Sequence, residues 1–173
     1  MRSFLVGLVV GVVLVPLVLF VVGSMGGLST HATADPPAWE ARFADRALEA
    51  SLSREARSLR NPITVNDDAL LAGMKLYIDN CSGCHGRPGE PSPWGTKNLY
   101  PRVPQFAEHP AHLGAGKMFV VVKRGIRYSG MGAWDGMLPD EDIWRIVTFL
   151  NTAHDLPPAV AATWNARKPA STG

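Results

Sequence analysis

The only two cysteines of the chain lie in one short segment, Cys81-Ser82-Gly83-Cys84-His85. The segment reads C-x-x-C followed at once by histidine, which is the attachment pattern of a c-type haem. Two thiols at this spacing can each form a thioether to one side of a porphyrin, and the adjacent histidine then reaches the iron as proximal ligand. The segment therefore predicts one covalent haem c held by Cys81, Cys84 and His85.

Three other uses of a C-x-x-C pair are weighed against haem. A thioredoxin-like redox pair belongs beside a βαβ pattern, and none is found in the sequence. A structural zinc site takes four Cys or His ligands, whereas the other histidines are scattered singly, at His31, His109, His112 and His154. A disulfide across two intervening residues would staple almost nothing. Haem is the interpretation that we favour.

Composition excludes several classes of function. The formal net charge of +2 is far from the strongly basic balance of a nucleic-acid-binding domain. The sequence shows no Ser-His-Asp arrangement, no paired carboxylates and no phosphate-binding loop. We therefore expect a protein that is not itself an enzyme and that has no small-molecule substrate.

The N-terminus is apolar almost without a break from Ser3 to Gly23, and no charge lies between Arg2 and Asp35. About 20 helical residues span about 30 Å, the hydrocarbon thickness of a bilayer. Because Arg2 precedes the span and no Lys or Arg follows it closely, the positive-inside rule places the N-terminus in the cytoplasm. We expect a single-pass anchor, with membrane contact through residues 3–23 and the haem on the outer side.

A cleaved signal peptide is the competing interpretation of this segment. Ala32-Thr33-Ala34 is an A-x-A cleavage pattern, which supports it. The apolar run, however, is longer than a usual signal core, and the A-x-A site lies far beyond its end. We favour a retained anchor, and under either interpretation the haem domain is exported.

Composition shifts divide the chain into five segments. They are the anchor or uncleaved signal 1–23, a linker 24–36, an amphipathic helix 37–62, a haem domain 64–156 and a C-terminal tail 157–173. Two interpretations of the amphipathic helix are considered. In one it docks on a membrane surface or a partner, and in the other it packs on the haem domain with its mixed charges in solvent. The mixed charge favours packing on the haem domain.

The sequence of the predicted haem domain shows helical patterns and no convincing strand. Asn66 can cap a helix that delivers Cys81 to the haem. The loop between residues 86 and 114 is rich in Pro and Gly. A short helix over 115–125 and a final helix over 139–154 follow, with acidic residues in the first turn of the last one.

The chain resembles the class I c-type cytochromes, especially small membrane-anchored bacterial forms, and the haem domains of cbb-type oxidases and periplasmic dehydrogenases. The resemblance is carried by Gly73 and Tyr77 ahead of CSGCH, by the segment GMGAW, and by a last helix reading DEDIWRIVTFL. It implies an all-α fold in which the first and last helices of the haem domain cross, with Gly73 and Tyr77 facing Ile146 and Phe149. It also implies a location at the bacterial inner membrane, facing the periplasm.

The sixth iron ligand is sought among the methionines. Met1 and Met25 belong to the anchor region, while Met74 and Met118 lie on helices as expected core residues. Met131 lies between two glycines, and the resemblance implies a ligand methionine in a similar G-M-x-A-W context; family members often have proline where this chain has Gly132. We expect Met131 as distal ligand. Met137, a distal histidine (His109 or His112) or an open site remain the alternatives.

Weaker expectations concern the surroundings of the haem. The other ring N–H of His85 should donate to a backbone carbonyl in the loop that contains Pro88, Pro91, Pro93 and Pro101. Trp94, Asn98 and Arg102 are candidates for the haem propionates, although ordinary loop packing is favoured for each. The basic run Lys117, Lys123, Arg124 and Arg127 is either a docking patch for an acidic partner or, as we favour, a solvated helix face.

Three functional hypotheses remain. The first is a tethered carrier that shuttles electrons between redox protein partners or a membrane respiratory complex. The second is the haem subunit of a larger oxidase or dehydrogenase. The third is a gas or redox sensor with a displaceable iron ligand.

Overall fold

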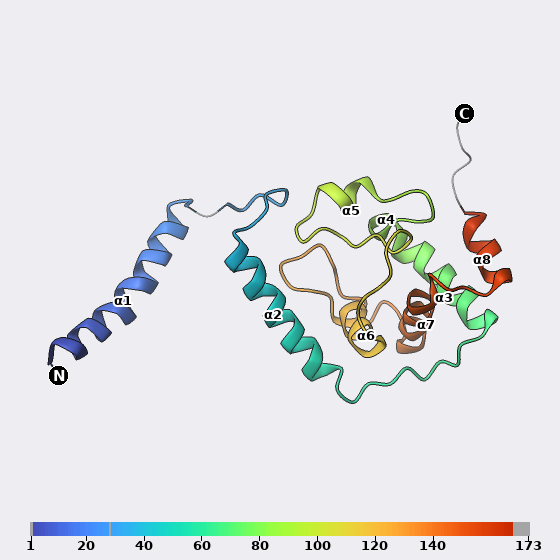
Figure 1. The fold of residues 1–173 in the computed structure, drawn as a ribbon, viewed down its shortest axis with the longest axis horizontal. Coiled ribbons are helices and arrows are strands. Elements are labelled where there is room, and N and C mark those ends of the chain that lie inside the picture. Colours follow the sequence, from blue (N-terminus) through green and yellow to red (C-terminus); the bar gives the residue numbers. More distant parts are fainter. Residues whose placement is uncertain (1, 28, 168–173) are drawn as a thin grey trace. The chain divides into compact units, whose positions relative to one another are not determined.

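The computed structural model describes residues 2–27 and 29–167, and it separates into two compact units, residues 1–36 and 37–173. The regular structure of the described residues is helical (Figure 1), with isolated β-bridges only, which confirms the predicted all-α class. The helices are α1 (Arg2–Ser24), α2 (Ala38–Glu55), α3 (Asp67–Asn80), α4 (Ser82–His85), α5 (Pro93–Lys97), α6 (Ala115–Arg124), α7 (Asp140–Thr152) and α8 (Pro158–Asn165).

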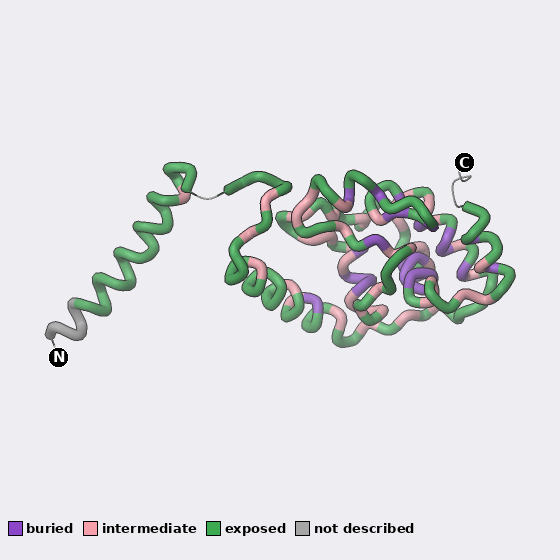
Figure 2. Tube along the Cα trace, turned by 45° about the horizontal axis from the view of Figure 1, so that its top comes forward, coloured by how far each residue is buried: buried purple, intermediate pink, exposed green. Residues whose placement is uncertain are grey.

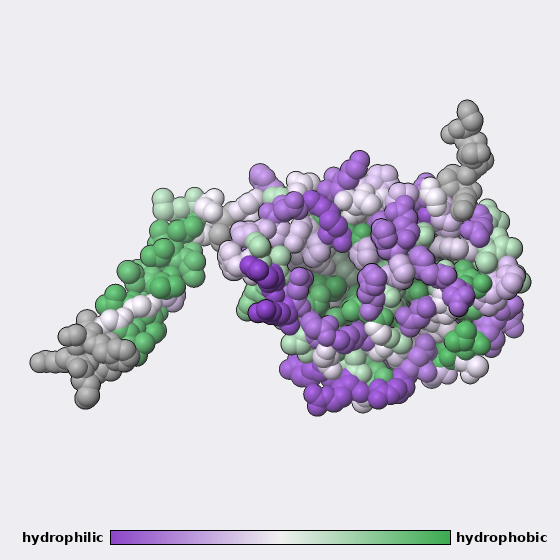
Figure 3. Space-filling view, in the orientation of Figure 1, coloured by the Kyte–Doolittle hydropathy of each residue, from purple (hydrophilic) through white to green (hydrophobic). Residues whose placement is uncertain are grey.

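The first unit is built around α1. Its stretch from Gly7 to Ser24 is long and apolar enough to cross a membrane, and none of it is buried. Apolar side chains cover the helix where it is described (Figure 3). In a soluble domain such a helix would bury at least one face, so this continuous apolar surface supports a membrane anchor.

The core of the second unit forms where α3 crosses α7. Asn66 caps α3 as predicted, its side chain accepting a hydrogen bond from the backbone N–H of Ala69 at 2.8 Å. At the crossing, a Cβ on Gly73 would lie 2.2 Å from the carbonyl oxygen of Arg145. Only a residue without a side chain lets the two backbones approach this closely. The predicted contact of Tyr77 with Phe149 is also found, with ring centroids 5.7 Å apart.

Helices α6 and α8 complete this core, and buried positions gather in the interior of the unit (Figure 2). From α6, Phe119 stacks on Trp144 with ring centroids 4.1 Å apart. Helix α8 lies in the segment predicted as a tail. Its Val160 and Trp164 are buried, and Trp164 packs edge-on against Phe149.

Helix α2 ends earlier than its pattern predicts, at Glu55 rather than near residue 60. Its C-terminal half packs on α6, because Leu52 is buried and Glu49 pairs with Lys117. In its N-terminal half, Trp39 and Phe43 are 65% and 71% exposed. This arrangement agrees with the interpretation in which the helix packs on the haem domain.

Candidate haem site

The CSGCH segment folds as one helical turn that continues from α3. Cys81 ends α3 and begins α4, and its carbonyl oxygen accepts the backbone N–H of His85 at 2.9 Å. The Ser82 hydroxyl donates to the carbonyl of Ile78 at 2.8 Å, which ties the turn to the preceding helix. The thiols of Cys81 and Cys84 are both free. Local sequence thus presents two thiols and an imidazole from a single turn.

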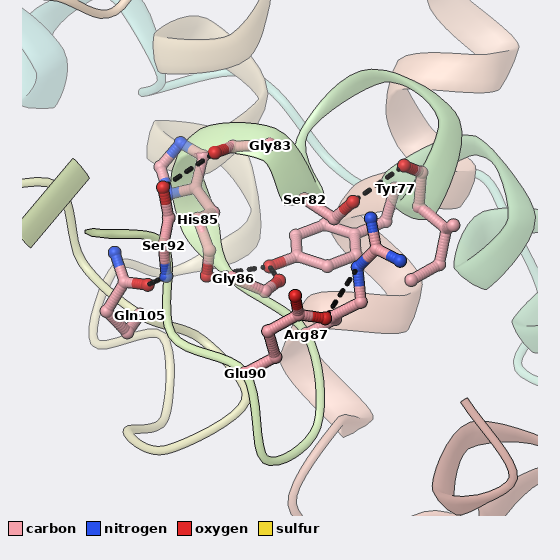
Figure 4. Close-up of polar contacts among 10 residues, drawn as sticks. Tyr77, Ser82, Gly83, His85, Gly86, Arg87, Glu90, Ser92 and Gln105 are labelled. Carbon is pink, nitrogen blue, oxygen red and sulfur yellow. Dashed lines mark hydrogen bonds and ion pairs between the residues drawn. The ribbon is translucent and has the colours of Figure 1, made fainter. Parts of the chain in front are cut away.

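Tyr77, a core residue of α3, holds the C-terminal end of the CSGCH turn. Its hydroxyl donates to the carbonyl oxygens of His85, at 3.0 Å, and Gly86, at 2.7 Å (Figure 4). Burial raises the pKa of Tyr77 well above its usual value, so the hydroxyl remains a donor across the physiological range. The tyrosine that marks the helix crossing therefore also holds the backbone of the histidine.

His85 is held by a carbonyl, as predicted, and the carbonyl belongs to Pro104. Its Nδ1 lies 2.9 Å from that oxygen, so Nδ1 carries the hydrogen and Nε2 is left as a lone-pair donor. The ring stacks on Phe106 with centroids 4.8 Å apart. Burial lowers the pKa of His85 more than the Pro104 hydrogen bond raises it, which favours the neutral imidazole that a metal requires.

The environment of the thiols argues against a dithiol redox pair. Burial, assisted by the neighbouring Cys84, raises the pKa of Cys81 to about 12. Reactive cysteines of the thioredoxin type have a lowered pKa instead. Among the residues that the structure describes, no three His, Cys, Asp or Glu side chains group as metal ligands, so the zinc interpretation gains no support either.

Met131 lies in the loop between α6 and α7, which is fastened to the end of α6. The carbonyl of Met131 accepts the N–H of Ile126 at 2.9 Å, and the N–H of Asp135 donates to the carbonyl of Lys123 at 3.0 Å. Gly125, at φ +69°, allows the close approach, because a Cβ there would lie 2.7 Å from the Met131 carbonyl oxygen. Met131 is partly buried against the core. Its assignment as the distal ligand stays a prediction.

The other methionines of the haem domain have different surroundings. Met74 and Met118 are buried in the core, as their positions on α3 and α6 predict, and Met137 is 75% exposed. His109 and His112, the alternative distal ligands, are both exposed.

The three candidates for the haem propionates lie in and beside α5, where the structure shows the following contacts. Arg102 donates to the carbonyl oxygen of Leu99 at 2.8 Å. Asn98 ends α5 through its backbone N–H, which donates to the carbonyl of Trp94. The Trp94 side chain is 59% exposed. None of these contacts tests a propionate role.

Acidic partners neutralise most of the basic run. Lys117 pairs with Glu49, a contact that also lowers the pKa of that glutamate. Lys123 pairs with Asp140 at 2.6 Å, and Arg124 with Asp135 at 2.8 Å. This agrees with a solvated helix face rather than an open cationic patch.

Sequence reasoning missed the residues that brace the CSGCH turn from the loop, namely Ser92, Pro104 and Gln105. Gln105 is the most informative of them, because a buried amide in a loop is uncommon. Its burial comes from contacts distant in sequence, and no local pattern marks it.

The donor set fits a c-type haem. It combines two free thiols on one turn with an imidazole whose Nδ1 is engaged and whose Nε2 is available. Residues 68–150 match the family described as "Cytochrome C oxidase, cbb3-type, subunit III". No curated protein matches the chain.

Proposed function

We propose that this chain, whose residues 68–150 are a c-type cytochrome haem domain, is a membrane-tethered electron carrier with one covalent haem c. Cys81 and Cys84 would form the thioethers, His85 would be the proximal iron ligand and Met131 the distal one. The observation that carries the proposal is the His85 imidazole, which is oriented through Nδ1 to the Pro104 carbonyl at 2.9 Å with Nε2 free.

The bound haem supplies a reversible one-electron couple between ferric and ferrous iron. The chain's own residues hold the site in one geometry during that change. Tyr77 fixes the carbonyls of His85 and Gly86, while Pro104 fixes the imidazole. Such a fixed site reduces the rearrangement that accompanies each electron transfer. One electron enters from a reduced donor and one leaves to an oxidised acceptor, so no substrate bond is made or broken.

The apolar surface of α1 supports a tether in the bacterial inner membrane. With Arg2 on the cytoplasmic side, the haem domain would face the periplasm. A tether confines the haem near membrane complexes and raises its local concentration there. The partners we propose are redox proteins or a membrane respiratory complex; the chain itself would be non-catalytic, with neither nucleic acid nor a small-molecule substrate.

The matched family favours a second function. Its description names a subunit of a cbb3-type oxidase, so the chain would serve as a haem-bearing subunit of a larger complex. Every haem ligand proposed above is common to the two functions, and only the assembly state separates them.

The experiment is to isolate the chain from membranes in a mild detergent and to measure its haem and its size. A pyridine haemochrome spectrum of haem c with two thioethers, together with a reversible one-electron titration, is expected. A particle that contains the chain alone supports the carrier, and a large haem-containing complex supports the subunit. Lack of covalent haem would contradict both.

A further inference from the structure

Gln105 is 6% exposed, and both the oxygen and the nitrogen of its side-chain amide form hydrogen bonds. Its Oε1 accepts the backbone N–H of Ser92 at 2.7 Å (Figure 4). Its Nε2 donates to two carbonyl oxygens, that of Cys84 at 3.0 Å and that of Val103 at 2.9 Å. Three separate backbone segments therefore meet at one side chain.

The two carbonyls that Gln105 binds have a specific relation to the histidine site. Cys84 immediately precedes His85, and Val103 immediately precedes Pro104. One amide nitrogen thus joins the backbone on either side of the bond between His85 Nδ1 and the Pro104 oxygen. Fixing the two preceding carbonyls at one nitrogen fixes the separation of that donor and acceptor.

Ser92, Gly86 and Gly95 also hold the loop against the CSGCH turn. The Ser92 hydroxyl donates to the carbonyl of Gly83 at 2.6 Å and accepts the N–H of Gly95 at 3.1 Å. A Cβ on Gly86 would lie 2.6 Å from Gln105 Oε1, and one on Gly95 would lie 2.2 Å from the Cys84 carbonyl oxygen. The loop after α4 therefore packs tightly against α4, and a side chain at either glycine would clash with it.

We propose that Gln105 is a positioning residue that sets the strength of the hydrogen bond from His85 Nδ1 to the Pro104 carbonyl and, through it, the reduction potential. The inference rests on the proposed role of His85 as proximal ligand. A hydrogen bond from Nδ1 makes the imidazole a stronger donor to iron. The stronger donor stabilises the ferric state, so weakening this bond raises the potential.

The test replaces Gln105 by methionine, which has a similar size and no amide, in the full haem-loaded chain. Two quantities are measured: exchange of the His85 Nδ1 hydrogen with solvent in the reduced protein, by NMR, and the reduction potential. In Gln105→Met, exchange should accelerate about five- to tenfold, the loss expected when one hydrogen bond is weakened. The potential should shift upward, with the haem still covalently bound.

Asn80 provides the matched control. Its side-chain amide donates to the carbonyl of Leu76 in its own helix at 2.8 Å, next to the same motif. Asn80→Leu should lower stability while the exchange rate and the potential remain those of the unsubstituted protein. If Gln105→Met behaves in this way too, Gln105 is merely structural and the inference is wrong.

Gln105→Glu provides the test if Gln105→Met does not fold. Gln105→Glu keeps the acceptor for the Ser92 N–H but offers at most one donor hydrogen to two carbonyls, so faster exchange is again expected, and unchanged exchange would overturn the inference. The unsubstituted protein tests the proposed function separately. If its His85 resonances show no iron-bound imidazole, the proposed function fails, whatever Gln105 does.

Discussion

At the scale of single residues, the histidine and the methionine of the proposed iron site are held in different ways. His85 is fixed directly by Tyr77 through its carbonyl and by Pro104 through its ring. The Met131 side chain has no polar group, so only its backbone is fastened, through Ile126 and the Ser129 hydroxyl. The methionine position therefore depends on the loop, and it is the residue whose role most needs a direct test.

Met131→Ala should leave the covalent haem in place, because the thioethers and His85 are untouched. The reduction potential should fall by an amount on the order of 0.1 V, since the thioether stabilises ferrous over ferric iron. The weak long-wavelength Fe–S(Met) absorption of the oxidised protein should disappear. Both changes are read from a redox titration followed by absorption spectroscopy.

Met137→Ala is the matched control, because Met137 lies in the same loop and is 75% exposed. It should retain both the band and the potential. Survival of the band in Met131→Ala, or its loss in Met137→Ala, would show that the assignment of Met131 is wrong.

Residues whose roles depend on near neighbours could be predicted from the sequence, and residues whose roles depend on loop closure could not. The Asn66 cap and the CSGCH turn follow from spacings of a few residues. Pro104 could not be selected, because the loop between residues 86 and 114 offers many carbonyls. The choice among them is made by Gln105, whose contacts with Ser92 and with Cys84 span 13 and 21 positions and leave no local pattern.

At the scale of elements, the crossing of α3 and α7 supports the whole candidate site, because α3 continues directly into the CSGCH turn. The close approach at Gly73 was expected from the resemblance to class I c-type cytochromes, in which the first and last helices cross at such a glycine. Helix α8 was not predicted, because its segment is rich in Ala and Pro and has weak periodicity. Only the crossing itself creates the surface on which Val160 and Trp164 are buried.

Gly73→Ala should destabilise the domain by about 1–3 kcal/mol. The added Cβ would lie 2.2 Å from the Arg145 carbonyl oxygen and 2.9 Å from the Phe149 Cβ, so the two helices must move apart. The free-energy cost of separating the helices exceeds the gain of about 1 kcal/mol that alanine gives over glycine inside a helix. Denaturant unfolding of the haem-loaded protein measures the free energy of unfolding.

Gly83→Ala, within the haem-binding turn, serves as control because nothing lies within 4 Å of its added Cβ. Its free energy of unfolding should stay within about 0.5 kcal/mol of the unsubstituted value. Equal stability of the two variants would mean that the helices do not cross at Gly73.

At the scale of the whole molecule, the charge pattern and the apolar N-terminal helix bear on how the proposed carrier would approach redox partners. Lys123 and Arg124 read as a cationic run along the sequence, but the fold brings Asp135 and Asp140 onto them. Asp135 lies in the loop between α6 and α7, and Asp140 begins α7, so the pairing follows from the fold and could not be predicted from α6 alone.

Because Lys117, Lys123 and Arg124 are paired with carboxylates, electron transfer to an anionic reagent such as hexacyanoferrate(III) should depend weakly on salt. We expect the rate to change less than about threefold between about 0.01 M and about 1 M salt, a range over which the Debye length falls from about 30 Å to about 3 Å. Stopped-flow oxidation of the reduced protein measures this rate.

Asp135→Asn should steepen the salt dependence, because it removes the carboxylate that pairs with Arg124 at 2.8 Å. A steep dependence in the unsubstituted protein that disappears in Arg124→Glu would contradict this expectation and would favour a docking patch instead.

The membrane segment is separable from the haem site, since every contact described around CSGCH and Met131 lies in residues 37–173, a compact unit by itself. A chain in which residues 1–36 are replaced by a cleavable export leader should therefore keep the absorption spectrum and the potential. It should move from the membrane to the soluble fraction. Its electron transfer to membrane-bound acceptors should slow. In the tethered chain, the linker over residues 24–36 extends at most ~45 Å and so keeps the haem at high local concentration near the membrane.

The intact mass of the natural protein decides whether that tether is retained. An anchored chain should fractionate with membranes and keep the apolar segment that precedes Asp35, so its mass exceeds that of a chain that begins at Asp35. A soluble protein that begins at Asp35, directly after the A-x-A pattern, would show instead that the segment is a leader. The haem site would be the same in that case, and the carrier would be freely diffusing, so this one measurement separates a tethered from a diffusing function without disturbing the haem.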